Sequence, residues 1–211
     1  MQRPGMWFAL PAAALLLIFF AYPLAVSLLQ SFFKTSGGVS TFVGFDQYAR
    51  MLRDPLILKS LGNALLILVV QVPIMIALAV GLAYLLNQAW LRFRSGFRLI
   101  TFLPAITTLV AYSVVFRVIM TTDGGLLNQA LAVFGVAPID WLNNEFWARV
   151  AVIASITWRW TGYNMVIILA GLQAIPQELY EAARIDGAGR WQTFWHVVVP
   201  QLRPVLIFTS V

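Results

Sequence analysis

The 211 residues are 61% hydrophobic and only 10% charged, whereas soluble domains average about 45–50% apolar and about 25% charged residues, so much of this chain must face lipid. The absence of cysteine excludes disulfides, cysteine-ligated metal sites and thiol catalysis. The formal charge of +6 does not point to nucleic acid, because the 14 lysines and arginines are scattered singly between apolar segments, as in the loops of membrane proteins.

Four apolar stretches are long enough to cross a membrane, since a helix needs roughly 20 apolar residues to span a bilayer core. These predicted spans are residues 6–33, 63–88, 97–120 and 149–174. A fifth apolar run, 204–211, is still apolar where the sequence stops. We expect this span to be incomplete, in a fragment or a truncated product. The first span is too long for the apolar region of a signal peptide, about 7–15 residues, so we interpret it as an anchor.

Arginines predict the orientation of the spans. Arg92, Arg94 and Arg98 crowd the short connector between the second and third spans, and positive charge is concentrated in the cytoplasmic loops of membrane proteins. Arg3 then lies on the same side. We therefore expect an all-α, multi-pass bundle, a single transmembrane domain over residues 1–211, with its N-terminus in the cytoplasm.

The segment 175–203, between the fourth and fifth spans, is too polar to cross a membrane but has helical features. Pro176 suits the first turn of a helix. Glu178 and Glu181 follow in the early turns, where carboxylates favour the positive end of the helix dipole. Arg184 is spaced to pair with Glu181 on one face. A short, exposed helix is therefore predicted.

Two glycines predict where this helix stops. Gly187 and Gly189 interrupt the helical pattern, and a second, apolar-rich helix is predicted from Trp191 to Val199, ending at Pro200. Small alanines would let another protein approach the first helix closely. The residues alone support equally well an amphipathic helix that rests at the membrane interface.

The same segment carries a pattern with fixed spacing. Glu181, Ala182 and Ala183 are followed after three residues by Gly187, and after nine more by residues 197–200, Val-Val-Val-Pro. This resembles the EAA motif, E-A-A, three residues, G, nine residues, I-x-L-P, of permease subunits of binding-protein-dependent ABC importers. Valine replaces the isoleucine and the leucine, which are apolar residues of similar volume.

Flanking residues extend the resemblance to the carbohydrate-uptake branch, the maltose-type and lactose-type permeases. They are residues 171–204, residues 45–48 (Phe-Asp-Gln-Tyr), Asn63 and residues 103–104 (Leu-Pro). The resemblance covers nearly the whole chain. It departs in length, because family members usually have at least six spans.

The resemblance implies an ABC type I importer permease fold in which the polar segment forms a coupling helix. In that family this helix docks in a groove of the ATP-binding-cassette subunit, and closure of two such subunits around ATP switches the permease pair between inward-facing and outward-facing states. By the resemblance, the docking residues are Glu181, Ala182, Ala183 and Gly187. The permease itself is not expected to be an enzyme.

The resemblance also implies partners. They are an ABC ATPase dimer, a second permease subunit and an extracytoplasmic solute-binding protein, in a bacterial plasma (inner) membrane. The outer stretch 123–145 is either a contact for that binding protein or an ordinary capped loop. ATP and Mg would be bound by the ATPase, since the chain has no G-x-x-x-x-G-K-[ST] phosphate-binding loop. We expect no cofactor and no metal on this chain.

Arg159 interrupts the fourth span and marks a candidate translocation path. A charge at that depth costs roughly 2.5–3.5 kcal/mol on insertion scales, so it should face a cavity or a partner. Its neighbours Trp158, Trp160, Tyr163 and Asn164 combine aromatic faces with hydrogen-bonding groups, a combination that suits a sugar. The alternative is a structural arginine that snorkels outward, with tryptophans marking the interface.

Other polar residues are better explained by structure. Gln30, Asn63 and Gln71 are predicted to form hydrogen bonds between helices. His196, the single histidine, makes neither a metal site nor a catalytic triad and is predicted to be structural.

Several functions remain open beside a sugar importer. The same machine could carry another solute, such as a glycerol phosphate or a polyamine. A secondary transporter usually has acidic residues at mid-membrane, and none of the four spans contains Asp or Glu. A membrane-embedded enzyme is disfavoured by the lack of paired carboxylates or a nucleophile with a base. Composition does not argue against a membrane scaffold, and only the EAA motif does.

Overall fold

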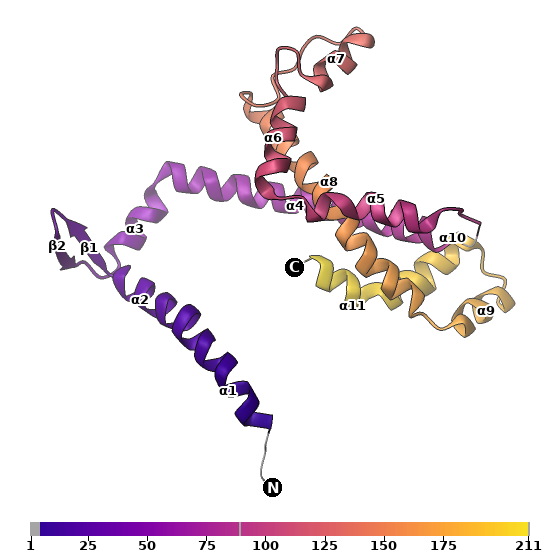
Figure 1. The fold of residues 1–211 in the computed structure, drawn as a ribbon, viewed down its shortest axis with the longest axis horizontal. Coiled ribbons are helices and arrows are strands. Elements are labelled where there is room, and N and C mark those ends of the chain that lie inside the picture. Colours follow the sequence, from indigo (N-terminus) through magenta and orange to yellow (C-terminus); the bar gives the residue numbers. More distant parts are fainter. Residues whose placement is uncertain (1–4, 89, 211) are drawn as a thin grey trace. The chain divides into compact units, whose positions relative to one another are not determined.

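The computed structural model describes residues 5–88 and 90–210, and these are helical almost throughout (Figure 1). In the described residues the one exception to the predicted all-α fold is a two-stranded hairpin. The chain divides into two compact units, Met1–Gly62 and Asn63–Val211, so the single domain over 1–211 stays a prediction. Arg3, on which the predicted orientation partly rests, and Val211 lie outside the described residues.

The first unit begins with one apolar helical run, α1 (Gly5–Leu16), a π-helical turn η1 (Leu17–Ala21) and α2 (Tyr22–Gln30). The stretch Phe8–Gln30 is long and apolar enough to cross a membrane, and none of it is buried inside the chain. In the π-turn the Tyr22 N–H bonds to the Leu17 carbonyl. This wider turn directly precedes Pro23, whose ring would clash with a carbonyl in a regular helix. The helix ends before residue 33, the predicted end of the first span.

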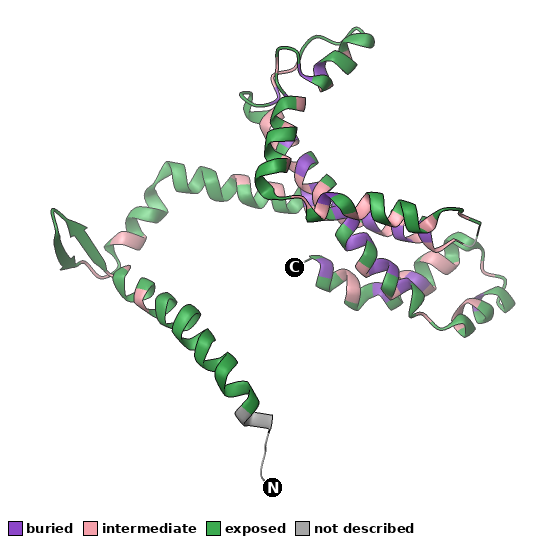
Figure 2. Ribbon diagram, in the orientation of Figure 1, coloured by how far each residue is buried: buried purple, intermediate pink, exposed green. Residues whose placement is uncertain are grey.

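A β-hairpin that we did not predict follows α2. Strands β1 (Phe33–Ser36) and β2 (Val39–Phe42) pair antiparallel, with Phe33 opposite Phe42, and both are exposed (Figure 2). Gly37 and Gly38 join them with φ angles of 60° and 81°. A tight two-residue turn needs positive φ at both positions, which glycine adopts at no steric cost. The Gly-Gly pair between two strand-like runs was the available signal.

Helix α3 (Asp46–Arg53) starts in the family-like stretch 45–48, and two side chains of that stretch tie the helix to the preceding elements. Gln47 Nε2 donates to the Phe33 carbonyl (2.9 Å), and the Tyr48 hydroxyl shares a 2.5 Å hydrogen bond with Ser31. The resemblance at these positions therefore coincides with the contacts that hold the first unit together.

The second predicted span lies in α4 (Pro55–Asn87), which is also long and apolar enough to cross a membrane. Its 33 residues correspond to about 50 Å of helix, more than a bilayer core of about 30 Å. Gln71 is buried in it, and Asn63 accepts a 3.1 Å hydrogen bond from Arg149 Nε of the later helix α8. That bond is one of the predicted helix-to-helix hydrogen bonds.

The predicted third span, 97–120, is not one helix. It forms α5 (Arg94–Ile106) and α6 (Leu109–Ile119), bent by 99° at the break between them. Thr107 and Thr108 have extended backbones, and the Thr108 hydroxyl oxygen caps α6 by accepting from the Ala111 N–H (3.2 Å). Threonine competes for backbone hydrogen bonds in this way, which explains the break.

Helix α7 (Leu126–Val133) and a loop lead to α8 (Glu145–Gln173). Asn144 caps α8, since its side-chain oxygen accepts from the N–H groups of Phe146 and Trp147, so the helix begins before residue 149, the predicted start of the fourth span. Although α8 is long, it is not among the helices apolar enough to cross a membrane, because it contains strongly polar residues such as Arg159 and Asn164. Its crossing stays a prediction.

The chain ends in α9 (Gln177–Ile185), α10 (Arg190–Thr193), a π-turn η2 (Phe194–Val198) and α11 (Val199–Ser210). We predicted a helix that ends at Pro200 and a new span from Pro204, but the helix continues through both prolines. The reason matches that at Pro23: the Val199 N–H bonds to the Phe194 carbonyl in a wide turn, which accommodates the ring of Pro200.

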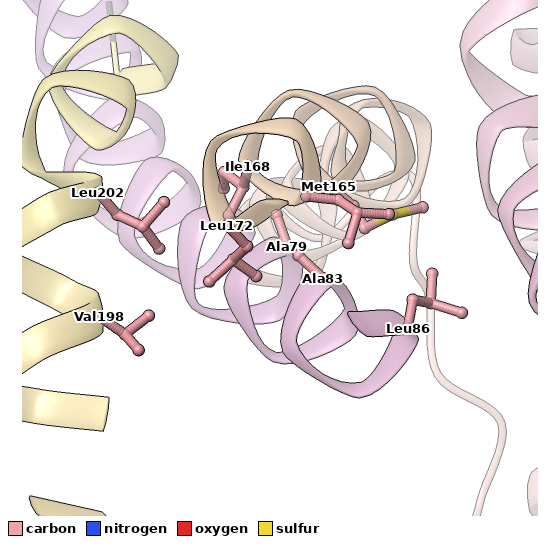
Figure 3. Close-up of a cluster of buried hydrophobic side chains, with 9 residues drawn as sticks. Ala79, Ala83, Leu86, Met165, Ile168, Leu172, Val198 and Leu202 are labelled. Atoms are coloured by element: carbon pink, nitrogen blue, oxygen red, sulfur yellow. The ribbon is translucent and has the colours of Figure 1, made fainter. Parts of the chain in front are cut away.

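The core of the second unit lies where α4, α8, η2 and α11 meet (Figure 3). Its buried side chains are Ala79, Ala83, Leu86, Met165, Ile168, Leu169, Leu172, Val198 and Leu202. Alanines on α4 let α8 approach closely, as small residues do in membrane helix pairs. Gly171 serves α11 in the same way, because a Cβ there would lie 3.0 Å from a methyl of Leu202.

Candidate functional site

Helix α9 ends in a Schellman motif, the turn that left-handed glycine allows at a helix C-terminus. The Ala188 N–H bonds to the Ala183 carbonyl (2.9 Å) and the Gly187 N–H to the Arg184 carbonyl (3.1 Å). Gly187 has a φ of 75°. This is the 6→1 and 5→2 pattern of that motif. The glycine of the EAA pattern is therefore required by backbone geometry.

The following helix is capped within the same turn. The Gly189 N–H donates to the Gln192 side-chain oxygen (2.9 Å), and the Thr193 hydroxyl donates to the Gly189 carbonyl (3.0 Å). A glutamine three residues after the cap satisfies the cap N–H as in a capping box. Both sides of the turn are hydrogen-bonded, so α9 and α10 are joined by a stiff connection.

The predicted docking residues do not share one surface. Glu181, Ala182 and Gly187 are exposed, whereas Ala183 is only 7% exposed and packs inward. We had expected Ala183 on the outer surface of the helix, but it lies on the inner side. The pairing of Glu181 with Arg184 is also absent, because within the described residues Glu181 makes no ion pair.

One exposed residue of α9 was missed. Ile185 is 87% exposed, although isoleucine is among the residues most often buried. At about 100° per residue, Ile185 lies on the same strip of the helix as Glu181 and Ala182. An apolar residue at the end of a polar helix was the signal in the sequence.

Two cavities lie beside α9, and Ala188 and Thr193 line both of them. One, of about 480 Å³, is lined by Ala182, Ala183 and Gly187 from the first side of the turn and by Gln192, His196 and Val197 from the second. The other, of about 600 Å³, is lined by polar and basic residues including Arg184. His196 itself is exposed, with Nδ1 3.0 Å from the Gln192 carbonyl oxygen, a local contact within its own helix.

The second candidate site surrounds Arg159. Its guanidinium carbon lies 5.1 Å from the ring centre of Tyr112 and 5.6 Å from that of Trp160, within the range of a cation–π interaction. Its Nη1 is buried and has no hydrogen-bond partner within the described residues. Buried polar groups nearly always have a partner, so this N–H is an unsatisfied donor enclosed among the helices.

Aromatic rings from two helices complete this cluster. Trp158 packs edge-on against Phe116 of α6 (5.3 Å between ring centres), and Tyr163 stacks on Phe102 of α5 (6.4 Å). Ring contacts thus connect four of the five predicted path residues to α5, to α6 or to one another. Sequence reasoning missed Tyr112, Phe116 and Phe102, because nothing local to α8 indicates which residues of other helices face it.

Asn164 does not belong to this cluster. It is buried, and its side-chain N–H groups donate to the Trp160 carbonyl (3.0 Å) and to Met75 Sδ of α4 (3.3 Å). Gln71 donates to the same sulfur (3.3 Å). Asn164 is therefore part of the packing of α4 against α8, whereas the Gln71 bond stays within α4 and is not the bond between helices that we predicted.

The loop before α8 is organised by one buried side chain, Asn128. It donates to the carbonyls of Thr122 (3.0 Å) and Ile139 (2.9 Å), and its oxygen accepts from the Ile139 N–H (3.1 Å) and from Trp141 Nε1 (2.9 Å). We did not predict this role. The stretch expected to touch a solute-binding protein is thus an ordered loop.

Asp140 stabilises the same loop and makes it sensitive to acid. Burial raises the pKa of Asp140, but hydrogen bonds from Thr122, Asn143 and Leu142 outweigh that effect and hold the pKa below its ordinary value. Since the folded pKa is depressed, this stabilisation is complete above about pH 4, the ordinary pKa of an aspartate, and is lost as the pH falls through the folded value.

We therefore expect acidification below pH 4 to loosen the loop, seen as a red shift of Trp141 fluorescence. The matched variant is Asp140→Asn, whose side-chain oxygen can accept the same bonds without titrating. The shift should be smaller in this variant. Identical acid titrations of the two proteins would contradict the role of Asp140.

Comparison with known proteins extends these observations. Residues 5–211 match the family described as "Binding-protein-dependent transport system inner membrane component". The chain is 43% identical to the lactose transport system permease protein LacF of Rhizobium radiobacter, covering 98% of this chain and 70% of LacF. It is 35% identical to the arabinooligosaccharides transport system permease protein AraP of Bacillus subtilis (strain 168), covering 95% of this chain and 64% of AraP.

A solved structure has the same fold. It is a bacterial ABC transporter involved in the import of the acidic polysaccharide alginate, with a TM-score of 0.84 and 24% sequence identity, over 98% of this chain and 71% of the matched one. At this identity the match establishes the fold alone. The ABC type I importer permease fold implied by the EAA motif is thereby confirmed for the described residues.

Proposed function

The chain belongs to the family of binding-protein-dependent transport system inner membrane components, and from that membership we propose that it forms part of the translocation path of an ATP-driven importer for a sugar or oligosaccharide. Relatives named for lactose and arabinooligosaccharide transport support this substrate class. The observation that carries the proposal is the geometry of α9: a short helix, rigidly capped at Gly187, that presents an exposed strip outside the core.

The exposed strip of α9, Glu181, Ala182 and Ile185, is the surface that we propose docks into a separate ATPase subunit. Glu181 offers a carboxylate with no ion pair inside the described chain, and Ile185 offers an apolar side chain for a pocket. The adjacent 480 Å³ cavity, with the inward-facing Ala183 on its wall, has room for a side chain of the partner. ATP and Mg would belong to that partner, which supplies the motor that this chain lacks.

A stiff connection is what such coupling demands. A displacement of the ATPase reaches the membrane helices only if α9 moves together with α10 and η2. The hydrogen bonds on both sides of Gly187 and the packing of Val198 and Leu202 against α4 and α8 supply that stiffness. ATP would then favour one state of the permease by its preference for one arrangement of the ATPases.

The substrate path is proposed to run past the Arg159 cluster. Sugar rings present apolar C–H faces, which suit the rings of Trp160 and Tyr112, and hydroxyl oxygens, which suit the guanidinium group of Arg159. A hydrogen bond to a charged group contributes about 1.5–3 kcal/mol. One guanidinium with aromatic neighbours favours a neutral sugar over a polyanion.

The remaining partners follow from the family. We propose a second permease subunit beside this one and an extracytoplasmic solute-binding protein that contacts the loop ordered by Asn128. The N-terminus would lie in the cytoplasm of a bacterium, with the chain crossing the plasma membrane several times. An importer for another solute is the second candidate, and uptake of sugar compared with uptake of the other solute in the assay below separates the two.

Uptake measurements test the proposed path. In proteoliposomes that contain the full-length protein with its ATPase, second permease and binding protein, radiolabelled sugar should enter only with ATP inside and binding protein outside. We expect Arg159→Gln to lower the apparent affinity of uptake about tenfold, which corresponds to about 1.4 kcal/mol. Arg117→Gln is the matched control, because Arg117 is exposed at the end of α6.

Two results would count against this assignment. Equal uptake curves for Arg159→Gln and the unmodified protein would return Arg159 to a purely structural role. ATP-dependent uptake of a polyamine or glycerol phosphate, with no sugar uptake, would overturn the substrate class.

A further inference from the structure

The 600 Å³ cavity beside α9 has a chemistry that the proposed coupling role does not use. It is formed by the last turn of α4, one face of α9 and the start of α10. Arg184 and Arg190 contribute two positive charges, and no Asp or Glu lines the cavity. Neither arginine forms an ion pair within the described part of the chain. An anion that enters this cavity would therefore meet uncompensated positive charge.

Neutral donors accompany the two guanidinium groups. The side chains of Asn87 and Tyr180 line the same cavity. Burial, and to a lesser degree the neighbouring Tyr84, raise the pKa of Tyr180, so its phenol keeps its proton at neutral pH and can donate. Guanidinium groups bind phosphate through two parallel hydrogen bonds. The set of donors matches a phosphate group.

The surroundings of the cavity place it at the surface of the membrane. Its lining includes Tyr84 and Asn87 at the end of α4, a helix apolar enough to cross the bilayer. Trp90, Phe93, Trp191 and Trp195 near the same end are 51–84% exposed. Exposed aromatic rings concentrate at the level of lipid headgroups. Trp191 also stacks on Phe194, which lines the cavity, so the aromatic surface is continuous with the cavity wall.

We propose that this basic cavity, centred on Arg184 and Arg190, binds the phosphate of an anionic phospholipid headgroup. A soluble phosphate has the same chemistry, but the exposed aromatic rings and the end of an apolar helix favour the lipid. Basic pockets between membrane helices bind anionic headgroups in this way. Because Arg184 lies on α9, the bound lipid would link the coupling surface to the composition of the membrane. The inference concerns lipid binding and does not depend on the transported solute.

The test measures lipid binding to the purified full-length protein by native mass spectrometry. Phosphatidylglycerol and phosphatidylcholine are titrated separately, and inorganic phosphate is added as a competitor. We expect phosphatidylglycerol to bind at least tenfold more tightly than phosphatidylcholine. The double variant Arg184→Gln/Arg190→Gln should reduce phosphatidylglycerol binding at least tenfold. The matched control is Arg92→Gln/Arg203→Gln, which removes two exposed arginines that do not line the cavity.

Three results would overturn the proposal. Equal losses in the two double variants would indicate a general effect of charge. Equal binding of the two lipids would exclude headgroup recognition. Inorganic phosphate that competes at the same concentration as phosphatidylglycerol would assign the cavity to a soluble phosphate. The variant Arg184→Lys/Arg190→Lys keeps the charges but not the paired N–H groups, so it should bind phosphatidylglycerol more tightly than the glutamine double variant and less tightly than the unmodified protein. This comparison separates loss of the site from misfolding, and none of these measurements involves sugar or ATP.

Discussion

Replacing Gly162 by alanine should disrupt the second unit more than any other single methyl addition. Gly162 is where α8 passes closest to α5, and a Cβ built there lies 1.7 Å from the Thr101 carbonyl oxygen and 3.0 Å from the Phe102 nitrogen. Both obstacles are backbone atoms, so no side-chain rotation relieves the clash. The two helices must separate, and the Tyr163–Phe102 stacking beside the crossing is lost.

Two opposing contributions decide whether Gly162→Ala raises or lowers the free energy of unfolding. In a helix interior alanine is about 1 kcal/mol more favourable than glycine, whereas overpacking of a tight contact costs typically 1–3 kcal/mol and sometimes more. A clash of this depth with backbone puts the cost at or above the upper figure. We expect a Tm lower by at least about 5 °C and a marked loss of folded protein in detergent.

Gly81→Ala is the matched control for this prediction. Gly81 lies in α4, and a Cβ there meets no atom within 4 Å, so the helix propensity term acts alone and the Tm should stay equal or rise. Thermal unfolding followed by size-exclusion chromatography compares the two variants. Equal Tm values would show that α5 and α8 do not cross at Gly162 as described.

Glu181→Lys should abolish coupling between ATP hydrolysis and transport while the complex still assembles in the membrane. The side chain is exposed and unpaired within the described chain, so reversing its charge leaves the fold of α9 unchanged. At an interface, residues that dominate binding cost 2 kcal/mol or more when altered, which is about thirtyfold in affinity. We expect uptake, and the stimulation of ATPase by solute and binding protein, to fall at least tenfold.

A graded series at the same position separates charge from helix stability. Glu181→Asp keeps the carboxylate and should retain most coupling, Glu181→Gln should fall between, and Glu181→Lys should be lowest. ATPase rates and uptake in proteoliposomes give both readouts. Normal solute-stimulated ATPase in Glu181→Lys would remove Glu181 from the docking surface.

The helical, membrane-spanning character of the chain was readable from the sequence, because apolar runs of about 20 residues are typical of helices that cross a bilayer. The predictions that were wrong concern places where local hydrogen bonds compete with a regular helix. Thr107 and Thr108 satisfy backbone groups in an extended conformation and break the third span, while a π-turn lets the last helix continue through Pro200, where we had predicted its end. A hydropathy profile averages over many residues and cannot reveal either effect. The Gly37–Gly38 pair was a sequence signal for the hairpin that we did not use.

The candidate site, like the fold, was predictable only in part. The position of Gly187 followed from the motif, and the structure adds the reason, a left-handed turn that closes α9. Which side of a helix faces a neighbour was not predictable, because that depends on the arrangement of α4, α5 and α6 around α8. Asn164 and Ala183 therefore turned out to face inward, and Tyr112 was found only beside Arg159. The membership in the permease family, indicated by the EAA motif, is confirmed by the comparisons.

The central claim is that a cytoplasmic ATPase subunit binds α9. Crosslinking tests this claim most directly. The 211 residues contain no cysteine, so an Ala182→Cys substitution places the single thiol of these residues on the exposed strip. In membranes with the assembled importer, this thiol should crosslink to the ATPase subunit through a short bifunctional maleimide. It should also resist a membrane-impermeant maleimide added outside intact cells. Labelling from outside the cell, with no crosslink to the ATPase, would contradict the account.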